Sequence, residues 1–236
     1  MAAHPMVNVE HLSELPTIII NRSPADQIDP ETARAVDEAW NGMLRENSRY
    51  FNGPMLVFNS FDERSNKISA SVGQYKHHAV RDSVNLDMHL LAVTGVVAAP
   101  DTSGVERYLI GTRSPKTHRY GNLLEFGPCG GIDVPPQPAT HMHPDDILQE
   151  LGRESIEEAG LDLSIAQFSP IALIRDNLVG SVDIVVRARL DSIPELSATW
   201  EYTQTQWMTS EQIKDIAEST PERFIPTAIS IAQMLI

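Results

Sequence analysis

Short apolar segments separated by polar or turn-forming residues dominate the second part of the 236-residue chain. Segments of this length that are rich in valine, isoleucine and leucine are typical of buried strands. Four of them predict strands at residues 90–98, 108–111, 170–173 and 182–186. We therefore expect a mixed sheet, with the stretch 123–138, dense in glycine and proline, as a loop between its second and third strands.

Three later stretches carry helical signals. Apolar residues recur at helical spacing over 144–159, and Gly160 follows where a left-handed cap is favoured. Residues 210–217 predict a second helix. Pro226 begins a third, over 227–236, because proline is tolerated at the first helical position. Sheet and helices together predict the α+β class.

The first part of the chain has a different pattern of apolar and polar residues. A β-branched run predicts a strand at 17–20, and two apolar runs at 55–60 and 67–73 predict a hairpin. Asp29 and Pro30 are typical of a helix start, and apolar residues at helical spacing extend this helix to about residue 47. We therefore divide the chain into a small α+β region at 1–87 and a larger domain at 88–236.

Charge excludes several classes of function. The chain has 18 Lys and Arg against 32 Asp and Glu, a net charge of −14, so its field repels nucleic acids and anionic membranes. The single cysteine, Cys129, cannot form an intrachain disulfide. The first residues show no basic region followed by an apolar run, as a secretory signal would require. We expect a cytoplasmic protein that binds neither nucleic acid nor membrane.

The predicted helix at 144–159 carries an unusual charge pattern. At about 100° per residue, Glu150, Glu154, Glu157 and Glu158 fall on one stripe of the helix. Like charges at four-residue spacing destabilise a helix by roughly 0.2–0.5 kcal/mol per pair. A hard divalent cation resolves this conflict, because Mg²⁺ prefers oxygen ligands. The alternative is an ordinary solvated acidic surface.

The order of residues in this helix is specific. Arg153 and Glu154, followed by Glu157 and Glu158 and then by Gly160, resemble the second half of the Nudix box, Arg-Glu-aliphatic-x-Glu-Glu-x-Gly-aliphatic. The resemblance implies the Nudix fold, an α-β-α sandwich with a mixed sheet between helices, over residues 88–236. It also implies hydrolysis of a nucleoside diphosphate derivative with Mg²⁺, or Mn²⁺ in its place.

The same resemblance assigns roles residue by residue. Glu154, Glu157 and Glu158 match the metal-binding glutamates, and Arg153 matches the arginine that braces loop and helix. For the general base it offers two candidates, Glu154 and a glutamate from a later loop, Glu201. Dimerisation is an expectation from the family alone.

The chain departs from the Nudix signature at three positions. The leading glutamate is replaced by Asp145, the aliphatic residue after Arg-Glu by Ser155, and an early glycine by Ala139. Gly130 and Gly131 resemble the Gly-Gly turn of the family, displaced by an insertion over 134–143. This insertion contains His141 and His143, which are either an additional imidazole pair near the metal or a polar loop.

Substrate preference rests on features outside the box. The segments 38–41, 50–54 and 73–76, and later 174–177, resemble Nudix diphosphatases of UDP-glucose and UDP-galactose. The implied reaction yields UMP and the sugar 1-phosphate. Two alternatives stay open: an ADP-ribose or ADP-sugar pyrophosphatase, which Glu125 and the sequence 130–133 resemble, and a Nudix-fold module that binds a nucleotide sugar without cleaving it.

Candidate substrate-binding residues lie on both sides of the Gly-Gly turn. A cation for the phosphates is expected among Arg113, Lys116 and Arg119, although surface solubility explains these residues equally well. Backbone amides of Gly130 and Gly131 are further phosphate candidates. Three aromatic residues are candidates for stacking on the base, against a role in packing: Tyr75, Trp200 and Tyr202.

Overall fold

The computed structural model describes residues 6–24, 28–196 and 200–235. Within these ranges, 12 strands form one mixed sheet in the order β1-β10-β11-β5-β3-β4-β2-β9, with β6 and β8 also paired to β5, and β7 and β12 paired to β6. The strands are β1 Val7–His11, β2 Thr17–Pro24, β3 Pro54–Asp62, β4 Lys67–Gln74, β5 Leu90–Pro100, β6 Glu106–Arg113, β7 Leu124–Phe126, β8 Cys129–Gly131, β9 His141–Met142, β10 Gln167–Asp176, β11 Ser181–Arg189 and β12 Tyr202–Met208.

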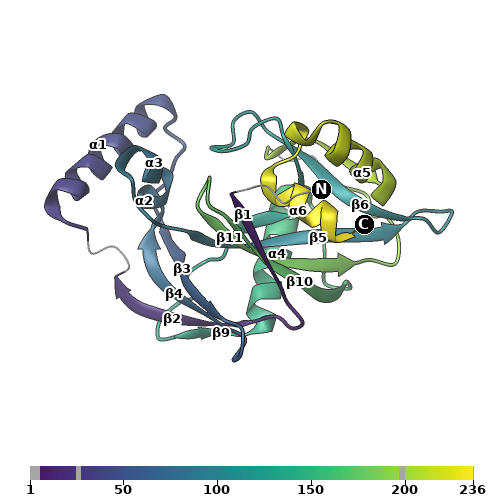
Figure 1. The fold of residues 1–236 in the computed structure, drawn as a ribbon, viewed down its shortest axis with the longest axis horizontal. Helices are drawn as coiled ribbons and strands as arrows, with labels where there is room; N and C mark the ends of the chain where they lie inside the picture. Colours follow the sequence, from purple (N-terminus) through teal and green to yellow (C-terminus); the bar gives the residue numbers. More distant parts are fainter. Residues whose placement is uncertain (1–5, 25–27, 197–199, 236) are drawn as a thin grey trace.

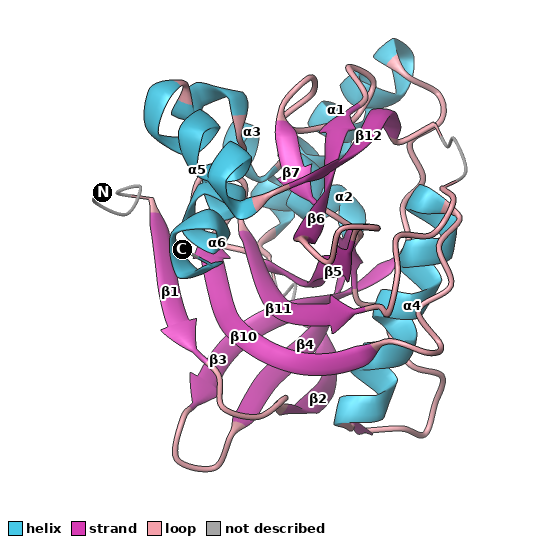
Figure 2. Ribbon diagram, turned by 90° about the vertical axis from the view of Figure 1, so that its right-hand side faces the viewer, coloured by secondary structure: helices cyan, strands magenta, loops and turns pink. Residues whose placement is uncertain are grey.

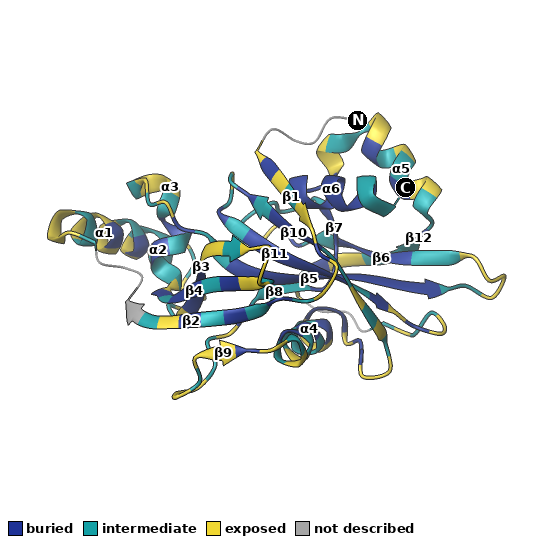
Figure 3. Cartoon of the chain, turned by 60° about the horizontal axis from the view of Figure 1, so that its bottom comes forward, coloured by how far each residue is buried: buried dark blue, intermediate teal, exposed yellow. Residues whose placement is uncertain are grey.

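Helices cover both faces of this sheet, as Figure 3 shows, with α4 on one face and α5 and α6 on the other. The helices are α1 Pro30–Glu46, α2 Tyr75–Ala79, α3 Arg81–Val84, α4 Pro144–Ala159, α5 Ser210–Ser219 and α6 Pro226–Leu235, with a 3₁₀ turn at Pro221–Arg223. The α+β class with a mixed sheet between helices is confirmed. Within the described ranges, no helix is long and apolar enough to cross a membrane.

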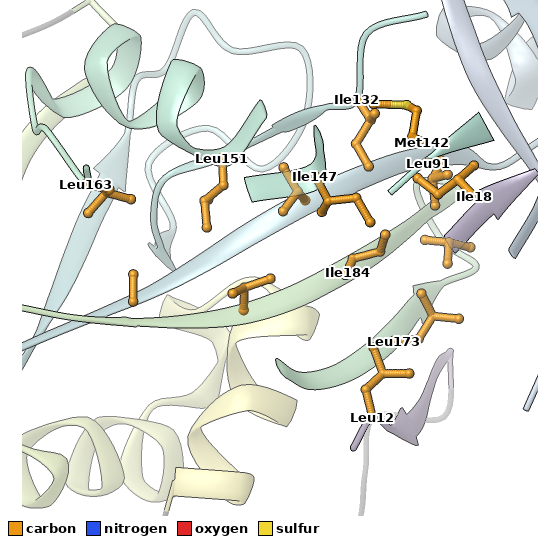
Figure 4. Packing of buried hydrophobic residues seen from close by; sticks show 14 of the residues in the cluster. Leu12, Ile18, Leu91, Ile132, Met142, Ile147, Leu151, Leu163, Leu173 and Ile184 are labelled. Atoms are coloured by element: carbon orange, nitrogen blue, oxygen red, sulfur yellow. The ribbon is translucent and has the colours of Figure 1, made fainter. Parts of the chain in front are cut away.

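Burial on both faces explains the apolar runs of the central strands. In β5, Leu91 and Val93 pack into the core beneath α4, while Val96 and Ala98 pack into the core beneath α6. A strand covered on both sides has no need of polar positions. In Figure 4, Ile147 and Leu151 of α4 lie over the strands that carry Leu91 and Ile184.

Strands β2 to β4 and helices α1 to α3 build one end of the molecule, whereas β1 pairs with β10 near α6. Figure 1 shows α1, α2 and α3 gathered beside the ends of β3 and β4, away from α5 and α6. Their small core surrounds Val36 and Trp40. Strands β2, β3 and β4 join the same sheet as the rest, through the pairing of Val57 with Leu90 and of β2 with β9.

Most predicted elements are confirmed, including the hairpin of β3 and β4 and the capping residues. Asp29 accepts hydrogen bonds from the amides of Glu31 and Thr32 at 2.9 and 3.0 Å. Gly160 adopts the left-handed conformation, with φ 61°, that its position after α4 favours.

The predicted loop at 123–138 is wrong in part, because β7 and β8 lie within it. Each of these strands has three residues. Strand β7 pairs with β6, and β8 pairs with β5. Glycine and proline mask such short strands, since their β character comes from the pairing partner and not from local propensity. Strand β1 was not predicted for a similar reason, because it is an edge strand that pairs with β10.

Helix α4 carries one buried polar group that its packing does not require. Ser155 is fully buried on the face that holds Leu151 and Ala159, at the position where the Nudix signature has an aliphatic residue. Its Oγ atom has no hydrogen-bond partner among the described residues. A buried hydroxyl without a partner lowers stability because it loses its bonds to water.

We predict that Ser155→Ala raises the free energy of unfolding by about 1 kcal/mol, measured by urea denaturation. Gly152→Ala is the control within α4: a Cβ there would meet no atom within 4 Å, so it reports the gain of about 0.5–1 kcal/mol from helix propensity alone. A Ser155→Ala protein less stable than the wild type would show that the hydroxyl contributes to folding.

Candidate functional site

The four glutamates of the α4 stripe differ strongly in exposure. Glu158 is 3% exposed, whereas the side chains of Glu154, Glu150 and Glu157 are 12%, 18% and 58% exposed. Figure 2 shows α4 alongside the sheet, and α4 contacts β8, where the Cys129 amide bonds Glu158. The stripe therefore runs from a carboxylate inside the protein to one at its surface.

Glu158 lies in a polar pocket between α4, β8 and β12. Its Oε2 atom accepts hydrogen bonds from the Cys129 amide at 2.8 Å and the Tyr202 hydroxyl at 2.9 Å. Burial raises the pKa of Glu158 well above its ordinary value, and the charge of Glu125 and a hydrogen bond with Glu201 raise it further. The hydrogen bond from the Cys129 amide therefore does not compensate for the burial and the neighbouring carboxylates that oppose ionisation of Glu158.

Glu154 occupies the next position toward solvent. Burial raises its pKa to about 7, and the charges of Glu157 and Glu201 act in the same direction against the ion pair with Arg153. Its carboxylate lies against Gly130, where a Cβ atom would collide with it. A larger residue at position 130 would force this carboxylate to move, which gives Gly130 a steric reason independent of phosphate binding.

Arg153 is the local counter-charge of the stripe. Its guanidinium lies 2.7 Å from Glu154 Oε1, 3.0 Å from Glu150 Oε2 and 3.2 Å from Glu157 Oε1. The arginine thus holds three carboxylates of one helix together, and it also approaches Asp133 at 3.7 Å. This agrees with a bracing role between helix and loop.

Glu201 comes to the cluster from a different part of the chain, directly before β12. Its backbone carbonyl accepts a hydrogen bond from the Ser114 amide at 2.7 Å, which fixes the start of β12 against the end of β6. The next residue, Tyr202, is buried with its ring against Gly111 and Gly127. Tyr202 therefore contributes to the cluster through its hydroxyl, which donates to Glu158. Because its ring is buried, the prediction that it stacks on a base is wrong.

Arg113 has a structural partner. Its Nη1 atom lies 2.7 Å from both carboxylate oxygens of Glu125, a residue that is 1% exposed. Burial would lower the pKa of the Arg113 guanidinium, but the charge of Glu125 outweighs this and raises it. The sequence did not reveal this pair, since the two residues lie 12 positions apart and meet only because β6 pairs with β7.

A cavity of about 880 Å³ opens beside the carboxylates. Its wall includes Glu201 and Arg113, together with the cations Arg49, Lys116 and Arg119. Arg119 also bonds Asp82 of α3 at 2.6 Å. Cations therefore outnumber the two carboxylates, Glu46 and Glu201, among the described charged residues of the cavity wall.

The N-terminal region also contributes to the wall of this cavity. Tyr50 and Tyr75 line it, and both pack on Trp40 with ring centroids 6.3 and 6.2 Å apart. His78 and His118 lie in the same wall, and burial lowers the pKa of His78 to about 4. Sequence reasoning missed Arg49 and both histidines, because only folding brings α1, α2 and the β6–β7 connection together.

The remaining candidates lie elsewhere or in other roles. Gly130 and Gly131 belong to β8, paired with Val93 and Ala92 of β5. Trp200 lines the large cavity and is 67% exposed. Three candidates from the insertion and the start of α4 are exposed and do not line this cavity: His141, His143 and Asp145.

The donor set fits a hard divalent cation. Among the described residues, no three His, Cys, Asp or Glu side chains are already arranged around one point as metal ligands. Mg²⁺ needs only one or two carboxylates, because waters and substrate phosphates complete its shell. Burial and neighbouring carboxylates raise the pKa values of Glu154 and Glu158. The two side chains therefore supply oxygen ligands in a place where positive charge is lacking.

Comparisons with known proteins find likeness in three-dimensional structure only. No family model matches the sequence, and no curated protein matches it. A Nudix hydrolase from M. smegmatis, RenU, is 18% identical, with 64% of this chain and 88% of that chain covered at a TM-score of 0.47. DR0079 from Deinococcus radiodurans is 18% identical over 77% and 98% of the two chains, with a TM-score of 0.48.

The NUDIX domain of Shewanella oneidensis NrtR, solved with ADP ribose, is 16% identical over 68% of this chain and 95% of that chain, with a TM-score of 0.47. At such low TM-scores and identities, these likenesses do not assign the chain to a family.

The buried pair of Arg113 and Glu125 gives a direct prediction. Arg113→Met leaves Glu125 buried without its partner, so we expect the free energy of unfolding to fall by about 3–5 kcal/mol in denaturant titrations. The double variant Arg113→Met with Glu125→Gln should recover most of this loss, because it removes the unpaired charge. If Arg113→Met is as stable as the wild type and only substrate binding weakens, Arg113 is a phosphate ligand and not a structural cation.

Proposed function

We propose that the protein is a Nudix pyrophosphohydrolase that cleaves a nucleoside diphosphate sugar of the UDP-glucose or UDP-galactose type to UMP and the sugar 1-phosphate. One observation carries the proposal: a cluster of buried and partly buried carboxylates from α4 and the start of β12 reaches, through Glu201, a cavity with several cations in its wall. Acidic and basic walls side by side suit a substrate whose anionic phosphates are bound together with divalent cations.

The order of residues in α4 supports the same function. The residues that match the Nudix box lie close together, with Glu154 held by Arg153 and Glu158 held by the Cys129 amide. Glu157 lies at the surface beside Arg153 and would join them as an outer ligand. An acidic stripe that served only solubility would not place Glu158 inside the protein.

The metal would be held by Glu154, Glu158 and Glu157, with Mg²⁺ as the expected ion and Mn²⁺ as a substitute. When bound, such an ion neutralises phosphate charge and makes a water molecule more acidic.

The protein's own groups account for binding and proton transfer. Arg49, Lys116 and Arg119 attract the anionic substrate toward the site. We assign acceptance of the proton from the attacking water to Glu201, since it lines the cavity, whereas Glu154 is held by Arg153 at 2.7 Å. Glu154 is the second candidate for this role.

The uridine and sugar preference is supported by the position of the residues that resemble the UDP-sugar enzymes. Tyr50 and Tyr75, from two of these segments, line the large cavity, and Trp40 from a third packs behind both. These segments thus lie where they can select a substrate. Buried Glu125, which resembles the ADP-ribose enzymes, instead pairs with Arg113.

The substrate is tested with a panel of UDP-glucose, UDP-galactose, ADP-ribose and dinucleoside polyphosphates, each with Mg²⁺. We expect UMP and a sugar 1-phosphate from the UDP-sugars, identified by chromatography. AMP released from ADP-ribose in preference would move the assignment to the adenosine enzymes. Binding of a nucleotide sugar with no product from any compound would favour a non-catalytic module.

A substitution separates catalysis from folding. We predict that Glu154→Gln lowers kcat at least roughly 100-fold, since a metal ligand should matter more than the 10–100-fold typical of groups around a site. The melting temperature should stay equal or rise, because the raised pKa of Glu154 means that its ionised form opposes folding at neutral pH.

Glu211→Gln, on the exposed first turn of α5, is the matched control and should change neither quantity. Wild-type turnover in the Glu154→Gln protein would contradict the assigned role.

A further inference from the structure

A second, smaller cavity lies next to the first. It has a volume of about 510 Å³ and shares Tyr75 and Leu90 with the larger one. Its size is within the range of pockets that bind small organic ligands, roughly 300–1,000 Å³. Two adjoining cavities with a common wall can accept the two halves of one elongated ligand.

The acidic cluster lies next to both cavities. Glu201, which shares a hydrogen bond with Glu158, lines the large cavity. Gly131 and Asp133 belong to the wall of the small cavity, and the preceding Gly130 lies directly against the Glu154 carboxylate. The Asp133 amide donates to Glu150 Oε2 at 3.3 Å, which ties this wall to α4. A ligand with its phosphates near Glu154 can therefore extend into the large cavity at one end and into the small cavity at the other.

The chemistry of the small cavity differs from that of the large one. None of the described residues that line it is lysine, arginine or histidine. Apolar side chains dominate, among them Pro54, Met55 and Val134, and the Asp133 side chain is 70% exposed and available as an acceptor. This composition excludes a phosphate and suits a flat, uncharged ring with N–H groups at its edge.

Phe51 is the most unusual residue of this cavity. It lines the cavity and yet is 79% exposed. A large apolar side chain exposed in this way is available for a ligand to cover. A Cβ atom on Gly53 would lie 3.2 Å from the Phe51 ring, so glycine permits the ring to approach the backbone there.

The loop that presents Phe51 is firmly held. Asn52 donates to Gln74 Oε1 at 2.8 Å and accepts from the Lys76 amide at 2.9 Å. The Tyr75 amide donates to the Gly53 carbonyl at 2.9 Å. An aromatic side chain on such a braced loop is prepared for stacking at little entropic cost.

We propose that the small cavity binds the nucleobase of the substrate, with Phe51 as the stacking platform and specificity-determining residue. The inference rests on the proposed function and deepens it. The base lies on the Phe51 ring with an N–H group directed to Asp133, the diphosphate lies beside Glu154, and the hydroxyl-rich sugar enters the polar cavity of Tyr50, His78 and His118. Base stacking on an aromatic side chain is tolerant of base identity, so Asp133 supplies the discrimination.

The experiment compares ligands with and without a base. Binding of UMP, AMP and ribose 5-phosphate is measured by calorimetry for the wild type, Phe51→Ala and Phe51→Trp, together with KM for the preferred diphosphate substrate. We expect Phe51→Ala to weaken the better-bound nucleoside monophosphate and to raise KM roughly 5- to 150-fold, as for the loss of one stacking contact. Binding of ribose 5-phosphate should change less than about twofold, and Phe51→Trp should restore nucleotide affinity.

Ile165→Ala is the matched control, because Ile165 is also 79% exposed and lines neither cavity. Nucleotide affinity that is unchanged in Phe51→Ala, or that falls equally for ribose 5-phosphate, overturns the proposal. So does a wild type that binds ribose 5-phosphate as tightly as both nucleotides. A protein that binds nucleotides through Phe51 but hydrolyses no compound contradicts the proposed reaction alone and leaves the base site supported.

Discussion

The burial and mutual repulsion of carboxylates gathered from two elements is the constraint on which the rest of this site depends. Glu158, Glu154 and Glu201 come from two elements far apart in the sequence, and the fold holds them together although burial and mutual repulsion oppose ionisation of Glu154 and Glu158. Folding alone does not favour such an arrangement, since an apolar residue at position 158 would be easier to bury. The arrangement becomes favourable when a dication and an anionic substrate share the site, which is why the acidic and cationic walls are understood best as one unit.

The surrounding structure positions this cluster with small residues and short hydrogen bonds. Glycine at 130 leaves room for the Glu154 carboxylate, and the Cys129 amide and Tyr202 hydroxyl orient Glu158. Arg153 compensates part of the charge along α4, while Arg113 neutralises Glu125 below the cavity. Each of these groups acts on a carboxylate, so the site is stabilised by balanced charge and hydrogen bonding more than by apolar packing.

Sequence reasoning predicted the parts of this molecule that local patterns determine. The bounds of α4, the cap at Gly160 and the β3–β4 hairpin follow from periodicity and turn residues, and the acidic stripe follows from helical geometry. Short strands such as β7 and β8 did not follow, because their residues become strands only through distant partners. The same limit applies to the site: helical spacing placed four glutamates on one side, but only the packing of α4 against β8 and β12 buries Glu158 and leaves Glu157 exposed. The places of Arg49, Phe51 and His78 in the cavity walls required the structure, because only folding brings these residues together.

The claim that the carboxylate cluster holds a divalent cation is tested most directly by Mn²⁺ binding, followed through the electron paramagnetic resonance signal of the free ion. The wild type should bind Mn²⁺ saturably, Mg²⁺ should displace it, and the double variant Glu154→Gln with Glu158→Gln should bind it at least roughly tenfold more weakly. Equal binding by the wild type and the double variant, or no binding by the wild type, would contradict the account.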